Sequence, residues 1–405
     1  MCIIRPAKVR YLIKIQALFV SLVILTLFQT TPLRAEEQDQ TQPTTQSQPS
    51  LNDRQQEEID QLRQRIQVLE DKESERETHP KFGMNLGVFG DVDFFTKNRE
   101  ADHTSFSLGP LDLYSTIHYG PRLSFLSEIT LDFDQPTGEG DVEIERLWVG
   151  YTFSDLLTVR AGRQHTALGY WNNTYHHGKL LFLTVDRPFF LAFEDDGGVL
   201  PVHTVGLEFS GSQNLPEFRW MYMLDVGNGH QIDSTTHKLV PNVTSDNNGS
   251  KQVALRLSIE PNRLRGLTLG LFGTYDKVGT DFNGNINERI FGGDLSFIRA
   301  KVEFITEYYR MQNPGHQADA DYIQLGYKIV RDITPYARYE TLKGVDPTDP
   351  YFINLQNSTS RHQSIAGVRY DIDELRSALK FQYRIDRKMG SETFHVLEAQ
   401  WSFSF

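Results

Sequence analysis

The feature that most constrains this chain is a two-residue alternation of apolar and polar side chains that starts near Phe82 and recurs to the C-terminus. Successive side chains of a β-strand point to opposite faces, so each such stretch has one apolar and one polar face. In the stretch 375–387 the apolar positions are Leu379, Phe381, Tyr383 and Ile385, and the polar positions between them are Lys380, Gln382 and Arg384. Such strands suit a barrel that turns its apolar face to lipid and its polar face to enclosed water.

The alternation predicts sixteen antiparallel strands. They are 82–95, 107–120, 121–134, 142–153, 156–165, 202–211, 216–226, 251–260, 265–277, 287–298, 299–310, 319–330, 332–341, 361–371, 375–387 and 394–405. A soluble β-sandwich also alternates, but its charge lies outside and its bulky apolar residues lie within. Sixteen strands are enough to enclose a water-filled channel, whereas eight are not. The predicted fold class is therefore an all-β transmembrane barrel, antiparallel, over residues 82–405.

Long and tight connections alternate along this series. The long ones are 96–106, 135–141, 166–201, 227–250 and 342–360, and the tight ones between them are 120–121, 154–155, 212–215, 261–264 and 372–374. Strict alternation places every long loop on one side of a membrane and every tight turn on the other. Both chain termini then fall on the side of the tight turns, which in bacterial barrels is the periplasm.

The N-terminus has the pattern of an export signal. Four basic residues and no acidic one precede an apolar run from Ile15 to Phe28, so residues 1–35 are predicted to be a signal peptide cleaved after Ala35. The run is shorter than the ~20 residues that a spanning helix needs, which disfavours a signal anchor. Cys2, the single cysteine, would be removed with the signal. No later segment has 18 consecutive apolar residues, which excludes a helical membrane protein.

The mature chain is acidic. The signal takes five of the 41 Lys and Arg residues and none of the 53 acidic residues, which leaves a net charge of about −17. This balance excludes nucleic acid as a partner.

Residues 36–76 are predicted to stand in the periplasm ahead of the barrel. Residues 36–53 are nearly all polar, so they predict a disordered tether. In 54–76 four apolar residues at spacings of three, four and three form one helical stripe, and these are Ile59, Leu62, Ile66 and Leu69. An isolated helix this short is marginal in water, so we interpret the stripe as a short α-helical coiled coil between protomers. The alternative is a helix on the barrel rim, or one that orders on meeting another periplasmic component.

The longest connection, 166–201, combines apolar runs with acidic residues. Residues 180–183 and 189–193 are apolar, and an exposed loop could not keep so many aromatic rings in water. We therefore expect them to pack against the inner barrel wall or a neighbouring protomer. An alternative makes 178–185 and 188–194 an extra hairpin and the barrel eighteen-stranded.

We hypothesise that this loop narrows the pore by opposing charges. The predicted constriction residues are Arg187, Glu194, Asp195 and Asp196. The predicted basic wall residues are Arg122, Arg160, Arg256, Lys328, Arg338, Arg369, Lys380 and Arg384. Opposed charges across a narrow water gap orient dipolar solutes and set ion preference. In the alternative interpretation these cations pair with the wall acids Glu128, Glu303, Glu340, Asp371 and Glu398 and only stiffen the barrel.

The chain resembles the sixteen-stranded trimeric porins of Gram-negative outer membranes, whose third loop follows the fifth strand and folds into the barrel. Its last strand, 397–405, resembles the terminal strand of outer-membrane barrels, which implies an assembly signal at Trp401, Phe403 and Phe405 that the barrel assembly machinery would bind. A coiled coil ahead of the barrel is similar to certain sugar and dicarboxylate porins. Residues 162–172 look like the strand-to-loop passage of phosphate-selective porins, but the loop has a single lysine, Lys179, where phosphate selectivity would imply several.

Other chemistry is not indicated by the sequence. His165, His176, His177 and His203 lack the cysteine or carboxylate spacing of a metal site, and no serine nucleophile motif is present. We therefore expect no metal, no cofactor and no enzymatic activity. The predicted function is a porin: a homotrimer, embedded in outer-membrane lipid, that passes small hydrophilic or ionic solutes passively. The alternative is a plugged barrel that serves surface binding or assembly and conducts little.

Overall fold

The computed structural model describes most of the chain from Phe82 to Phe405. The described residues are 82–97, 104–133, 140–175, 178–192, 198, 200–232, 239–240, 248–280, 284–346, 348–353, 360–391 and 393–405. The predicted signal peptide, tether and coiled coil therefore lie outside the described residues. So do the predicted protomer contacts at Ile59, Leu62, Ile66 and Leu69.

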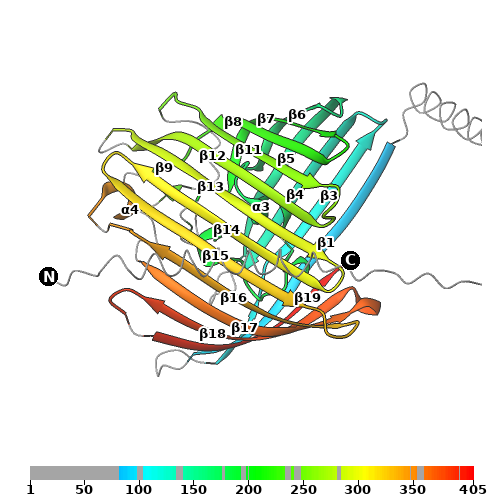
Figure 1. Cartoon of the computed structure of the whole chain (residues 1–405), viewed down its shortest axis with the longest axis vertical. Helices are drawn as coiled ribbons and strands as arrows, with labels where there is room; N and C mark the ends of the chain where they lie inside the picture. Colours follow the sequence, from blue (N-terminus) through cyan, green and yellow to red (C-terminus); the bar gives the residue numbers. More distant parts are fainter. Residues whose placement is uncertain are drawn as a thin grey trace, which may run out of the picture. The chain divides into compact units, whose positions relative to one another are not determined.

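The described residues form one closed antiparallel barrel (Figure 1). Its strands are β1 (Phe82–Lys97), β2 (Ser105–Leu108) with β3 (Leu111–Tyr119), β4 (Leu123–Phe133), β5 (Gly140–Ser154), β6 (Leu157–His165), β7 (His203–Asn214), β8 (Phe218–Asn228), β11 (Gln252–Pro261), β12 (Leu267–Thr280), β13 (Ile286–Arg299), β14 (Val302–Asn313), β15 (His316–Tyr327), β16 (Ile333–Lys343), β17 (Arg361–Ile372), β18 (Ser377–Lys388) and β19 (Thr393–Ser404). The last strand pairs with the first, and Val88 and Phe405 exchange two backbone hydrogen bonds of 3.0 Å. The prediction of sixteen strands is confirmed.

The second strand of the barrel is broken in two. Both β2 and β3 pair with β1, and Gly109 and Pro110 lie between them. A Cβ on Gly109 would lie 2.1 Å from the Asp91 carboxylate, so only glycine fits there.

Burial follows the alternation read from the sequence. On β18 the rings of Phe381 and Tyr383 are exposed on the outer face, while Lys380 and Gln382 are buried on the inner face. The inner face is therefore polar and the outer face apolar, as a strand between lipid and water requires. Within the described part of the chain, no helix is both long enough and apolar enough to cross a membrane.

The connections depart from strict alternation. The loops 98–104, 134–139, 166–202, 229–251 and 344–360 lie at one end of the barrel, and turns of two to five residues lie at the other. However, three connections at the long-loop end are also short: 281–285, 314–315 and 389–392. Pro314 and Gly315 alone join β14 to β15, because the backbone-permissive Gly315 (φ 104°) closes a tight turn.

The eighteen-strand alternative is wrong. Residues 178–192 contain two short 3-10 turns, η1 (Lys179–Leu181) and η2 (Phe189–Leu191), and no strand. Their backbone groups bond to side chains of the inner wall rather than to a neighbouring strand. Two minor strands, β9 (Gln231–Ile232) and β10 (Leu239–Val240), belong to the connection after β8 and add nothing to the barrel wall.

Candidate functional site

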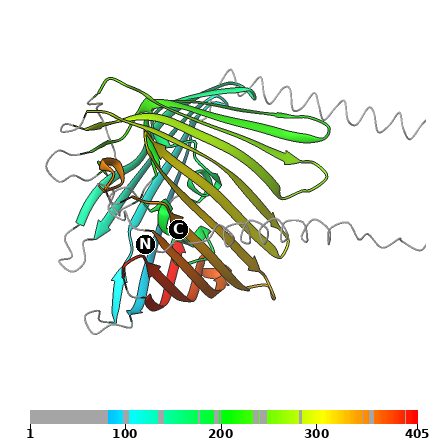
Figure 2. The ribbon, with the colours of Figure 1, turned by 60° about the vertical axis from the view of Figure 1, so that its left-hand side comes forward.

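The connection between β6 and β7, residues 166–202, folds into the barrel, and we call it the inward loop. Its short helix α3 (Tyr170–Thr174) lies within the ring of strands in both ribbon views (Figure 1 and Figure 2). Its buried apolar residues include Leu168, Trp171, Phe182, Phe190, Leu191 and Leu200. They pack in one cluster with inward-facing residues of β12–β16 that include Phe272, Ile290, Ile305, Tyr309, Tyr322 and Leu342. The expectation that the apolar runs pack against the inner wall is confirmed for Phe182, Leu183, Phe190 and Leu191.

The start of the inward loop is anchored by one carboxylate of β14. Glu307 accepts hydrogen bonds from the backbone N–H groups of Tyr170 (3.1 Å) and Trp171 (2.7 Å). It also accepts hydrogen bonds from the hydroxyl groups of Tyr309 (2.5 Å) and Tyr322 (2.7 Å). The first turn of a helix has unsatisfied N–H groups and a partial positive charge, so a buried carboxylate is the partner that suits α3.

Gly169 makes this approach possible. It has a left-handed backbone (φ 63°), and a Cβ there would lie 1.9 Å from the Tyr309 hydroxyl oxygen. We predict that Gly169→Val displaces α3 and lowers the melting temperature of the detergent-solubilised barrel. Gly390→Val is the control, because Gly390 also has positive φ (77°) but nothing lies within 4 Å of its Cβ position. Equal losses in the two variants would mean that backbone strain, and not the contact with the wall, accounts for the effect.

The middle of the inward loop is held by three cations of the wall. Lys380, which has no exposed surface, donates to the carbonyls of Lys179 and Thr184 and to Gln400 Oε1. Arg369 Nη1 donates to the carbonyls of Leu180 (2.6 Å) and Phe182 (2.9 Å). These hydrogen bonds satisfy main-chain carbonyls that have no strand partner.

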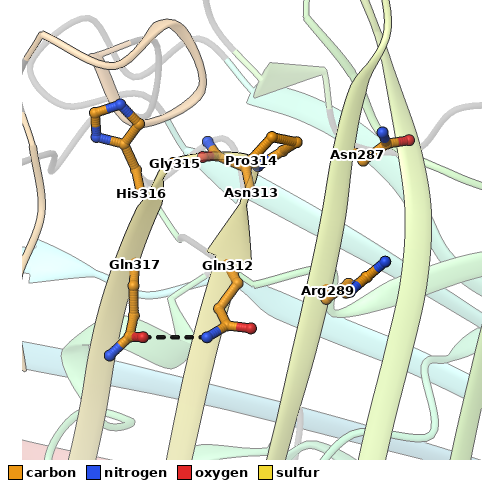
Figure 3. Close-up of a pocket in the computed structure, with 8 residues that line it drawn as sticks. All are labelled: Asn287, Arg289, Gln312, Asn313, Pro314, Gly315, His316 and Gln317. Carbon is orange, nitrogen blue, oxygen red and sulfur yellow. Dashed lines mark hydrogen bonds between the residues drawn. The ribbon is translucent and has the colours of Figure 1, made fainter.

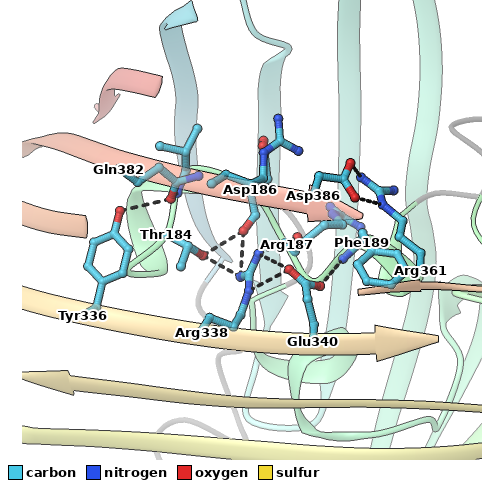
Figure 4. Close-up of polar contacts among 12 residues, drawn as sticks. Thr184, Asp186, Arg187, Phe189, Tyr336, Arg338, Glu340, Arg361, Gln382 and Asp386 are labelled. Atoms are coloured by element: carbon cyan, nitrogen blue, oxygen red, sulfur yellow. Dashed lines mark hydrogen bonds and ion pairs between the residues drawn. The ribbon is translucent and has the colours of Figure 1, made fainter. Parts of the chain in front are cut away.

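Arg338 is the third of these cations. Figure 4 shows its guanidinium directed from β16 toward the loop. It donates to Thr184 Oγ1 (2.7 Å) and to the carbonyls of Asp186 (2.9 Å) and Arg187 (3.0 Å). Next to it on the strand, Glu340 accepts the N–H of Phe189 at 2.6 Å. The wall therefore holds the loop through its backbone carbonyls, which accept from Arg338, and through a backbone N–H, which donates to Glu340.

We predict that Lys380→Met loosens the inward loop. The carbonyls of Lys179 and Thr184 would be buried without a donor, and each such group costs roughly 1–3 kcal/mol. The expected result is a lower melting temperature and larger fluctuations of the open-channel current in single-channel recordings. Lys301→Met, at an exposed tight turn, is the control. Quiet recordings and unchanged melting in the Lys380 variant would contradict the anchoring role.

The wall cations also pair with acids of the wall. The ion pairs are Arg338–Glu340 (3.2 Å), Arg369–Asp371 (2.7 Å), Arg384–Glu398 (2.5 Å), Arg160–Glu208 (2.6 Å), Arg256–Asp294 (2.6 Å) and Lys328–Asp371 (3.7 Å). Glu194, Asp195 and Asp196 lie outside the described residues. The pattern observed is thus pairing within the wall together with hydrogen bonds to loop carbonyls. For most of these cations this pattern matches the alternative interpretation, in which they pair with acids of the wall.

The tip of the inward loop reaches the first strand. Lys179 Nζ lies 2.8 Å from Asp91 Oδ2 and 3.0 Å from Asp93 Oδ2. Burial by itself would lower the pKa of Lys179, but the two carboxylates raise it above its usual value. The ammonium therefore stays charged at neutral pH and binds the tip to β1.

A cavity of about 440 Å³ remains between the inward loop and the opposite wall, and we call it the passage. One side is acidic and comprises Asp112, Asp132, Glu143 and Glu145 of β3, β4 and β5. The other side is basic and comprises Arg338, Arg361 and Arg384 of β16, β17 and β18. Asp186 and Arg187 of the loop lie on its boundary. The two charge signs are therefore segregated onto different strands.

The predicted site residues are distributed unevenly around this passage. Arg187, Arg338 and Arg384 line it, whereas Arg160, Arg256, Arg369 and Lys380 do not. Arg122 and Lys328 lie outside the strands, in turns at the tight-turn end, because β4 starts at Leu123 and β15 ends at Tyr327. Each lies one residue beyond its strand, and neither lines the passage.

Several residues of the passage escaped the sequence analysis. Arg361 lies eight residues before Arg369, so it has the same inward parity on β17, and that parity was the available signal. On the acidic side, Asp132 and Glu143 were missed because they lie near strand ends next to a long loop, where the alternation is hard to assign. The C-terminal residues Trp401, Phe403 and Phe405 lie at the seam where β19 meets β1.

Two of the histidines lie together on the inner wall. His165 and His203 are opposite each other on β6 and β7, and His203 Nε2 lies 3.2 Å from Glu145 Oε2. Among the residues that the structure describes, no three His, Cys, Asp or Glu side chains are grouped as a metal site. His176 and His177 lie outside them.

Comparison with known proteins relates the chain to others by structure alone. No protein-family model and no curated protein sequence matches it. Similar solved structures include OmpF of Salmonella typhi in complex with daunomycin (9% identity, TM-score 0.57), covering 80% of this chain and 97% of that one. An anion-selective porin of Comamonas acidovorans has 13% identity and a TM-score of 0.52, and the match covers 80% of this chain and 100% of that one. A loop L8 deletion mutant of OmpT, an outer membrane protein of Vibrio cholerae, has 11% identity and a TM-score of 0.51. That match covers 80% of this chain and 99% of the other. The chain therefore has the sixteen-stranded barrel fold of the porins.

Proposed function

We propose that this protein is a porin of the bacterial outer membrane, a passive diffusion channel for small hydrophilic or ionic solutes. The observation that carries the proposal is the passage of about 440 Å³ left between the inward loop and the acidic wall of a closed barrel. Charged side chains on both sides favour hydrated solutes over apolar ones. Diffusion through water needs neither a cofactor nor an energy source, and neither is part of the proposal.

The deciding experiment is planar-bilayer recording on the purified protein. A porin is expected to insert with discrete conductance steps in salt solution. A barrel without steps, although folded by circular dichroism and heat-modifiable mobility, would support the plugged surface-binding or assembly barrel instead.

The proposal includes the orientation and the assembly. The long loops face the outside, both termini face the periplasm, and the C-terminal strand is bound by the barrel assembly machinery. Three copies assemble as a homotrimer, with residues 54–76 as a coiled coil between them. Conductance steps in threes and a trimeric mass by native mass spectrometry are expected. A variant lacking residues 36–76 tests the coiled coil separately, through the fraction that remains trimeric.

A further inference from the structure

The outer surface of the barrel has a polar pocket of about 500 Å³ at the long-loop end of β13–β15, which we call the head pocket (Figure 3). Arg289 and Asn287 of β13 are exposed, whereas Glu288 and Ile290 between them are buried on the inner side. Because strand residues alternate between faces, Arg289 points away from the lumen. The head pocket therefore belongs to the surface that meets the surrounding bilayer.

The head pocket is rich in hydrogen-bond donors and has one available cation. Arg289 pairs in register with Gln312, and Gln312 with Gln317, so the three form one row across three strands. Gln312 Nε2 donates to Gln317 Oε1 at 3.1 Å. Among the described residues, the Arg289 guanidinium has no hydrogen-bond or ion-pair partner. Arg310 on the next strand, by contrast, lies 2.7 Å from Asp319.

An apolar groove of about 720 Å³ lies on the same outer surface, nearer the middle of the strands. It spans β8 and β11–β14 and is lined by Trp220, Leu257, Leu271, Gly293, Leu295 and Tyr308. Gly293 has no side chain, which hollows the surface between Leu271 and Tyr308. Arg289 and Gly293 are four residues apart on one face of β13, or roughly 13 Å at 3.3 Å per residue. The groove thus begins within one acyl-chain length of the head pocket.

We propose that the head pocket and the apolar groove together bind one lipid whose head group carries a phosphate. The phosphate bonds to the Arg289 guanidinium and to neighbouring amides, and an acyl chain runs past Phe291 into the groove at Gly293. Charge complementarity supports this occupant, because a planar guanidinium recognises phosphate through two parallel hydrogen bonds. The apolar groove below holds the acyl chain by van der Waals packing, because there is no hydrophobic driving force between apolar groups within a bilayer. This inference goes beyond solute passage and rests on the proposed outward orientation of the long loops.

Native mass spectrometry of the detergent-solubilised mature chain tests the proposal. The probes are bisphosphorylated lipid A and the same lipid after chemical dephosphorylation, which has the same acyl chains. We expect the phosphorylated form to bind about tenfold more tightly, as the loss of one charge-assisted interaction implies. Arg289→Ala should abolish this preference. Arg387→Ala removes an equal charge from the outer face of β18, outside the head pocket, and should leave the preference intact.

A second variant tests the groove. Gly293→Leu fills it, and the new Cβ lies 3.3 Å from both Leu271 Cδ2 and the Gly270 carbonyl oxygen, so folding of this variant is checked first by heat-modifiable mobility. Weaker binding of both lipids is expected. Equal affinity for the two lipids, or equal effects of the two arginine variants, would overturn the proposal, as would competition by inorganic phosphate alone at comparable affinity. A change of oligomeric mass in Gly293→Leu would assign the groove to protomer contact instead. Conductance steps recorded on the same samples show whether a failure concerns the lipid site or the channel.

Discussion

Replacing residues 168–200 with a short Gly-Ser linker is expected to raise the single-channel conductance severalfold. The inward loop packs against the β12–β16 wall and bounds the passage, so its removal is expected to widen the lumen there. The linker can be short, because Thr166 N donates to Val202 O at 3.0 Å and the loop ends are thus adjacent. Planar-bilayer recording in 1 M salt measures the effect, since charge is screened there and pore width dominates.

The loop-less variant also exposes the apolar patch of the inner wall around Tyr309 and Tyr322, so its melting temperature should fall. Its folding is checked by heat-modifiable mobility before any recording. Lys380→Met provides the milder comparison, since it keeps the loop and removes one anchor. A folded loop-less barrel with unchanged conductance would show that the inward loop does not limit the flow.

Much of the barrel was predictable because the rule that governs it is local. Phe381 and Tyr383 alternate with Lys380 and Gln382, and each strand carries such an alternation by itself. The number of strands and the face of each side chain can therefore be predicted without knowing which strands pair. The break at Gly109 was not predictable. The close approach of the Asp91 carboxylate to Gly109 is a contact between segments, which the alternation within one strand does not encode.

The position of the inward loop could be predicted, but its chemistry could not. Its aromatic residues indicate burial wherever they lie, which is why packing against the wall was expected. By contrast, whether Arg338 faces a loop carboxylate or a loop carbonyl depends on backbone geometry that alternation does not encode. The 3-10 turns at Lys179 and Phe189 direct carbonyl and N–H groups toward the wall. Lys380 donates to the Lys179 carbonyl, and Glu340 accepts the N–H of Phe189. A cation of the wall near an inward-folded loop can therefore serve to anchor the loop backbone as well as to set the ion selectivity of the channel.

The segregated charges of the passage distinguish these two roles. Arg338 and Arg384 line the passage and are also paired with Glu340 and Glu398. The acidic residues of the passage lie on other strands than Arg338, which donates to the loop carbonyls, so changing them leaves these hydrogen bonds in place. This arrangement makes the acidic side the more direct target for changing ion preference without releasing the loop.

Neutralising the acidic side with Asp132→Asn and Glu143→Gln is expected to shift the reversal potential in a KCl gradient toward anions. Each carboxylate attracts a cation at 4 Å by about 1 kcal/mol in bulk water, which corresponds to up to about fivefold in local cation concentration. Arg361→Gln on the opposite side should shift the potential the other way. The matched control is Glu217→Gln with Asp373→Asn, which removes two carboxylates at the tight turns outside the passage. Both shifts should shrink in 1 M salt, where the Debye length is about 3 Å. Equal shifts in the control and in the passage variant would mean that net charge, and not the passage, sets the ion preference.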